Sequence, residues 1–150
     1  MRLLPPSTNG AYRGARASAW FLGLLAALTI GPGLIHTLLP DGGAHAIAGL
    51  DLGDRREVIV GVFRWEGATQ LALGLAMLAV SIRYQSLTGL FLLLVLLQNT
   101  LTALEGWVVS PPSNGHHPPE HYGALKIAPL TAIFLVLALR PRRTAASAGT

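Results

Sequence analysis

The sequence predicts an all-α integral membrane protein, a four-helix bundle that forms a single membrane domain over residues 1–150. Three observations support this prediction. Hydrophobic residues make up 51% of the chain and charged residues only 12%, about half the charged share of an average soluble domain. The apolar residues gather into long runs, and four of these runs approach the length of about 20 residues that a helix needs to cross a bilayer. A soluble chain of this size could not cover such runs, so the expected solvent is lipid.

Four helices are expected in order along the chain, each ended by residues that break helices or carry charge. The first is closed by Pro40 and the turn that follows it, and the second begins after the charged run at 54–57. The third stops at a serine and two prolines, and the fourth stops at Arg140. Proline and the residue before it disfavour helix, so these ends are physically reasonable. The expected spans are about residues 17–39, 58–82, 87–109 and 122–139.

The first span also has a rival interpretation as a secretory signal. Two arginines precede it, and Ala44-His45-Ala46 resembles a cleavage site with small residues. The apolar core of a signal is usually about 7 to 15 residues long, and this run is longer, so we expect a membrane helix. Pro32 lies between two glycines and predicts a kink below His36. The segment 44–52 is apolar enough to form a short helix on the membrane surface, or to remain a loop.

The distribution of arginine predicts the orientation. Seven arginines lie in the two tails and in the loop between the second and third helices, whereas only Arg55 and Arg56 lie in the first loop and none lies in the third. Cytoplasmic loops carry the excess of positive charge. Both termini are therefore expected on the cytoplasmic side of a multi-pass protein of the cell (plasma) membrane.

Charge and composition exclude several function classes. The net charge is +4, but the basic residues lie at the ends of apolar runs and not in a stripe with interleaved aromatics, so no nucleic-acid partner is expected. The chain has no cysteine, which excludes disulfides, thiolate metal sites and cysteine-ligated iron–sulfur clusters. The sequence names no cofactor.

The third loop contains residue types that bind metal ions. His116, His117, Glu120 and His121 lie close together, and imidazole and carboxylate groups are zinc or copper ligands. The two prolines between them prevent a regular helical spacing of the ligands. We therefore expect a solvated loop and no metal site.

Ionisable residues inside the predicted helices form one layer. Such residues are expensive in a membrane and normally face the bundle interior or a water-filled cavity. At a rise of about 1.5 Å per residue, the charged members lie roughly 6 to 12 Å below the outer boundary, with the histidines above them. The layer contains Arg64, Glu66, Glu105, Lys126, His36 and His121.

Amides extend this layer toward mid-depth. At about 100° per residue, Glu66 and Gln70 share one face of the second helix, and Glu105 shares a face of the third with Gln98 and Asn99. The sequence therefore predicts a site with Glu66 and Glu105 as catalytic carboxylates. Its predicted ligand pocket consists of His36, Arg64, Gln70, Gln98, Asn99, Lys126 and His121.

Three functions remain open for this layer, and the sequence does not decide whether the protein is an enzyme. Its two cations balance its two carboxylates, so one function is binding or converting a lipophilic small molecule in a charge-balanced polar pocket. Another is a structural or accessory subunit, in a homo-oligomer or a larger membrane complex, whose buried ion pairs set helix register. The third is a small proton-coupled transporter. The expected partners are the lipid bilayer and, under the first interpretation, that small molecule.

The segment from Phe63 to Leu75 reads R-x-x-G-x-x-x-L-A-x-G-L from Arg64 onward. With the four short helices, it resembles the DoxX-like group of small bacterial membrane proteins. The resemblance covers the second helix and the overall layout. It implies a bacterial source and assigns Arg64, Gly67 and Gly74 as structural or pocket positions. That group includes subunits linked to quinone-coupled sulfur oxidation and oxidant resistance, but this sequence has no independent sign of quinone chemistry.

Overall fold

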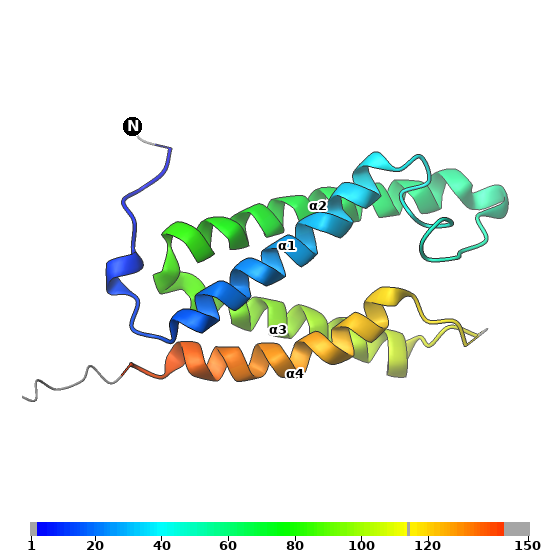
Figure 1. Cartoon of the computed structure of the whole chain (residues 1–150). Helices are drawn as coiled ribbons and strands as arrows, with labels where there is room; N and C mark the ends of the chain where they lie inside the picture. Colours follow the sequence, from blue (N-terminus) through cyan, green and yellow to red (C-terminus); the bar gives the residue numbers. More distant parts are fainter. Residues whose placement is uncertain (1–2, 114, 143–150) are drawn as a thin grey trace, which may run out of the picture.

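The computed structural model describes residues 3–113 and 115–142, and its four long helices run antiparallel to their neighbours in the chain (Figure 1). Each of the four predicted spans is a helix, and all four helices are long and apolar enough to cross a membrane. The long helices are α1 (Arg16–Leu38), α2 (Arg56–Arg83), α3 (Thr88–Leu104) and α4 (Pro119–Leu139). Shorter elements adjoin them: η1 (Asn9–Ala11), η2 (Gly53–Arg55), η3 (Gln85–Leu87) and the π-helix η4 (Glu105–Val109).

The structure differs most from the predicted bounds at two helix ends. α3 ends at Leu104 and the π-helix η4 continues it to Val109, whereas α4 begins at Pro119 and not near residue 122. Proline is favoured in the first turn of a helix, where its missing N–H needs no partner and its backbone angle is already helical. Glu120 follows in the same turn, where a carboxylate interacts favourably with the helix dipole. The earlier start moves Glu120 from the loop into the helix.

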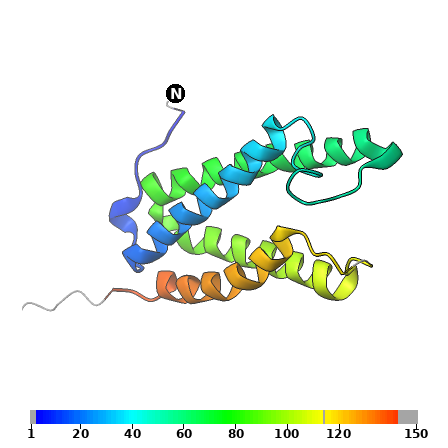
Figure 2. The same cartoon turned by 45° about the vertical axis from the view of Figure 1, so that its right-hand side comes forward.

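The helices pair into two hairpins. α1 packs mainly against α2, and α3 packs mainly against α4. In both views the hairpins meet at the end that carries the two chain tails and diverge toward the opposite end (Figures 1 and 2). We call these the tail end, which includes the α2–α3 connection, and the loop end, which carries the α1–α2 and α3–α4 connections. The bundle is therefore joined at one end and open at the other.

Contacts between α1 and α4 hold the hairpins together at the tail end. Ser18 Oγ donates a hydrogen bond to the Phe134 carbonyl at 2.9 Å, and the rings of Phe21 and Phe134 stack with centroids 4.1 Å apart. The hydrophobic core lies beside this junction. Its buried members are Leu22, Leu25, Ala26, Met77, Val80, Leu92, Val95 and Ala138.

The N-terminal segment closes the tail end. Asn9 Nδ2 donates to the Ile82 carbonyl at 2.7 Å, and the Arg83 guanidinium donates to the Pro5 carbonyl. On the other side of the bundle, Arg142 Nε donates to the Gly14 carbonyl at 2.6 Å. These bonds tie both tails to the helix ends.

Two glycines let α1 and α2 approach closely. A Cβ atom at Gly67 would lie 2.8 Å from His36 Cβ, and a Cβ atom at Gly74 would lie 2.6 Å from Ile30 Cγ1. Small residues at such contacts allow helix backbones to pack closely, as in membrane helix pairs generally. Gly67 and Gly74 therefore lie where α1 and α2 pack closely.

The α1–α2 connection forms hydrogen-bonded turns, so the surface helix considered for 44–52 does not form. The Asp41 carboxylate accepts backbone hydrogen bonds from Ala46, Gly43 and His45 at 2.8, 3.0 and 3.1 Å. The bonds from Ala46 and Gly43 hold the pKa of Asp41 below its ordinary value. The turn also needs Gly42, whose φ of +64° favours glycine.

Candidate functional site

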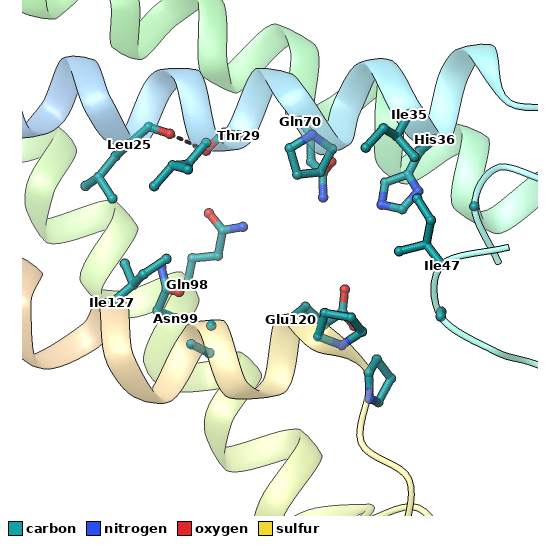
Figure 3. A pocket seen from close by; sticks show the side chains of 18 of the residues that line it. Leu25, Thr29, Ile35, His36, Ile47, Gln70, Gln98, Asn99, Glu120 and Ile127 are labelled. Carbon is teal, nitrogen blue, oxygen red and sulfur yellow. Dashed lines mark hydrogen bonds between the residues drawn. The ribbon is translucent and has the colours of Figure 1, made fainter. Parts of the chain in front are cut away.

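A cavity of about 380 Å³ lies between the hairpins toward the loop end (Figure 3). Residues of all four long helices and of both loop-end connections line it. Leu25, Val95 and Ile127 line its deep part, nearest the tail-end core. Its polar lining includes His36, Gln70, Gln98, Asn99 and Glu120. The volume falls within the range of roughly 300–1,000 Å³ for small-molecule sites.

His36 is held by the loop that covers the cavity. Its Nδ1 lies 2.6 Å from the Gly42 carbonyl oxygen. A carbonyl only accepts, so Nδ1 carries the hydrogen, and in the neutral ring Nε2 is then a hydrogen-bond acceptor. The Phe63 ring meets the imidazole edge-on at 5.1 Å. His36 therefore has a fixed orientation, and its Nε2 has no hydrogen-bond partner among the residues that the structure describes.

Gln70 connects the cavity to Glu66. Its Nε2 donates to Glu66 Oε1 at 2.8 Å, across one turn of α2. Gln70 lines the cavity, whereas Glu66 does not. Both residues are half-buried. The carboxylate of Glu66 is thus attached to the wall of the cavity through a neutral amide.

The two amides of α3 behave differently. Asn99 Nδ2 donates to the Val95 carbonyl at 2.9 Å, within its own helix. Gln98 extends toward the middle of the cavity (Figure 3). Within the described part of the chain, no hydrogen bond occupies the Gln98 side chain, so its amide is free to donate to or accept from a ligand.

Glu120 lines the cavity but is absent from the site predicted from the sequence. Its carboxylate points into the cavity from the first turn of α4 (Figure 3), and its side chain is 55% exposed. Its ion-pair partner is His121, with Nε2 4.0 Å from Glu120 Oε1. The Pro-Pro-Glu sequence, read as a helix start, would have placed Glu120 on the same face as Gly123, Ala124 and Ile127.

The charge-balanced layer expected from the sequence does not assemble. No ion pair in the described residues joins Arg64 or Lys126 to Glu66 or Glu105. Arg64 is exposed and its Nη2 approaches the Pro40 carbonyl at 3.5 Å. Lys126 and Glu105 are also exposed and line no part of the cavity. Arg64 lies more than a quarter turn from Glu66 around α2, and its long side chain reaches the loop instead.

His121 packs at the loop end of the α3–α4 hairpin and not in the cavity lining. Its ring lies directly over Gly106, where a Cβ atom would collide with it. Its Nδ1 lies 3.1 Å from Nδ1 of His117, and the ring of Trp107 stacks on His117 at 3.8 Å. In residues 3–113 and 115–142, no group of three or more potential ligands could hold a metal ion.

By length and composition, the four helices of this chain are long and apolar enough to cross a membrane, as those of a multi-pass membrane protein are. Its distinguishing feature is the cavity between two hairpins that are joined at the tail end. Comparisons with protein-family models, with curated proteins and with solved structures give no match for the chain.

Proposed function

We propose that the protein binds a lipophilic small molecule in the cavity between its hairpins. The observation that carries the proposal is the composition of the cavity: an apolar deep part with a few polar groups that converge above it. Ligand sites generally combine these two features, because apolar walls supply affinity and a few polar groups fix orientation. We place this site in the outer half of the cell membrane, with both tails cytoplasmic.

The fold supports entry from the loop end. The tail end is filled by the hydrophobic core and tied by hydrogen bonds from both tails. At the loop end the cavity is covered by chain connections, which contribute Ile47 and Pro118 to its lining. Loops move more readily than packed helices. A ligand would therefore enter beneath the connections and place its apolar part toward Leu25 and Ile127.

Binding is proposed here without catalysis. Glu105 lies outside the cavity, and Glu66 accepts a hydrogen bond from Gln70. In the described lining, the groups suited to moving a proton are Glu120 and the Nε2 atom of His36. Conversion of the ligand would have to use these two residues in place of the two carboxylates predicted from the sequence.

The test compares a variant that fills the cavity with one that does not. A Cβ atom at Gly123 or at Gly61 would meet no atom within 4 Å, but Gly123 lines the cavity and Gly61 does not. The full chain and the variants Gly123→Leu and Gly61→Leu are purified in mild detergent. Native mass spectrometry then measures the small molecules that remain bound.

We expect a bound lipophilic molecule on the unmodified chain and on Gly61→Leu, and its loss from Gly123→Leu. Equal retention by all three proteins would contradict the proposed site. Absence of any bound molecule, together with no thermal stabilisation by added membrane lipid extract, would contradict the proposed function.

An accessory role is a second candidate, and a specific observation favours it. Glu105 is the first residue of η4, directly after α3, and Lys126 lies on α4. Both residues are exposed and lie within segments that could cross a membrane. An unpaired charge facing lipid is costly. A second copy or a larger complex could supply the missing partners. The single variants Glu105→Lys and Lys126→Glu should then each disrupt an oligomer. The double variant should restore it, and native mass spectrometry measures the oligomeric state.

The DoxX-like assignment and a bacterial source also remain proposals. The close packing at Gly67 and Gly74 supports the first, because the resemblance rests partly on these glycines. Arg64, the third shared position, lies on the exposed side of α2. Proton-coupled transport remains a prediction whose test is substrate flux that depends on a pH gradient.

A further inference from the structure

The described cavity lining contains a carboxylate but no lysine or arginine. That carboxylate belongs to Glu120, and Glu66 lies close enough to interact electrostatically with Glu120. His36 and His121, which can carry a positive charge when protonated, also interact electrostatically with Glu120. One carboxylate therefore lines this space and a second lies behind its wall, and the described lining has no permanent cation.

Arg64 and Lys126, the two basic residues of the predicted layer, do not line the cavity. Lys126 is exposed. Arg64 lines a separate, smaller groove with Arg56 and Pro40 on the α2 side of the first connection. Neither side chain forms an ion pair with a carboxylate in the described residues. A cationic ligand would supply the positive charge that lysine and arginine do not bring to the described lining.

The free polar atoms of the cavity are mainly acceptors. Glu120 offers two carboxylate oxygens, and His36 offers Nε2 because its Nδ1 is bonded to the Gly42 carbonyl. Gln98 adds a free amide oxygen from α3, in the same hairpin as Glu120. A head group with several N–H donors would match this arrangement, whereas an anionic group would meet repulsion.

The shape and depth of the cavity define the rest of the ligand. Leu25, Val95 and Ile127 line its deep part, away from Glu120. The polar head and the apolar tail are therefore separated along the helix direction. Phe63 lies beside His36 and presents an aromatic ring to the cavity near the head position, where it could also face a cation.

We propose that the cavity selects an amphiphile with a protonated amine head group. The ammonium would lie between Glu120 and His36 Nε2, and the alkyl chain would extend toward Leu25 and Ile127. This inference rests on the proposed function, since it assigns the chemical class of the molecule bound in the same cavity. Charge pairing with the Glu120 carboxylate is what separates an amine from an alcohol of equal length.

The test uses three photoreactive probes that differ only in the head group: dodecylamine, dodecanol and dodecanoate, each with a diazirine at the same carbon. The full chain is reconstituted in nanodiscs of a zwitterionic lipid and irradiated with each probe. Peptide mass spectrometry then identifies the labelled residues. Concentration series give the apparent affinity for labels on cavity residues.

We expect the amine to label the cavity with an apparent affinity about tenfold or more above that of the alcohol, the difference that a charge-assisted hydrogen bond typically makes. Equal labelling by amine and alcohol, or preferred labelling by the carboxylate, would overturn the amine inference and leave the proposed function intact. Absence of cavity labelling by all three probes would overturn both.

Matched variants assign the effect to the proposed carboxylate. Glu120→Gln removes the charge in the cavity, and Glu105→Gln makes the same change outside it. The preference for amine over alcohol should fall about tenfold in Glu120→Gln and remain in Glu105→Gln. If Glu120→Gln does not fold, as judged by size-exclusion chromatography, Glu66→Gln replaces it with a smaller expected loss. An unchanged preference in the folded variant would contradict the inference.

Discussion

Gln70 Nε2 donates a hydrogen bond to Glu66 Oε1 at 2.8 Å, and this bond joins a residue of the cavity wall to a carboxylate behind it. The two residues are one helical turn apart on α2, the spacing at which helical side chains meet. The bond satisfies a half-buried carboxylate without a cation. It also explains how Glu66 contributes negative charge to the cavity while remaining outside its lining.

Loss of this bond should destabilise the protein. Gln70→Leu would leave the Glu66 carboxylate without its donor, which typically costs about 1–3 kcal/mol for a desolvated group. Thermal unfolding of the full chain in detergent measures the change. Gln98→Leu is the matched control, because the Gln98 side chain forms no hydrogen bond in the described residues. Equal stability of the two variants would show that the Gln70–Glu66 bond contributes little.

Close packing of α1 and α2 at Gly67 should make this position intolerant of a side chain. Gly67→Ala would place a methyl group 2.8 Å from His36 Cβ, and such overpacking typically costs about 1–3 kcal/mol. A Cβ atom at Gly61, on the same helix, would meet no atom within 4 Å. Because alanine has a greater helix propensity than glycine, Gly61→Ala should preserve or raise stability. Denaturation of both variants under identical conditions tests the difference. A stable Gly67→Ala protein would contradict the observed packing.

The α1–α2 connection should loosen in acid. Hydrogen bonds from Ala46 and Gly43 lower the pKa of Asp41 in the folded protein, so ionised Asp41 stabilises the turn above the unfolded aspartate pKa of about 3.9. That contribution is lost as the pH falls from there through the lower folded pKa. The protection of the Gly43 and Ala46 amides against hydrogen exchange, relative to the intrinsic exchange rate at each pH, should fall over this interval. In Asp41→Asn, this protection should already be lower near neutral pH and change less on acidification.

The loop end of the α3–α4 hairpin should depend on Gly106. A methyl group at this position would collide with the His121 ring, so Gly106→Ala should displace His121 and disturb the Trp107–His117 stack. Fluorescence of Trp107 reports the change when Trp20 and Trp65 are replaced by phenylalanine. Gly123→Ala, which has open space, should leave the emission unchanged. An unshifted spectrum for Gly106→Ala would argue against this packing.

The helices could be predicted from the sequence because the signal for each one is local. Long apolar runs between charged or proline-containing segments are sufficient to locate all four helices within about three residues, when η4 is counted as the continuation of α3. The same local information identified several residues of the cavity. His36, Gln70, Gln98 and Asn99 were predicted for the pocket and all four line it.

The charge pattern of the cavity could not be predicted, because it depends on where side chains end and on which helices pair. Arg64 and Lys126 occupy membrane-depth positions in the sequence, but their side chains are exposed. The sequence predicts that the fourth helix starts near residue 122 and therefore leaves Glu120 in a loop, whereas α4 begins at Pro119. The separation of the hairpins toward the loop end depends on packing between distant segments and has no local signature.

A density map of the full chain in lipid nanodiscs tests the central claim most directly. The account predicts ordered non-protein density in the cavity, with its polar end within hydrogen-bonding distance of Glu120 and its apolar end near Leu25 and Ile127. A cavity that contains only water, or hairpins that close against each other along their full length, would contradict a binding site between them.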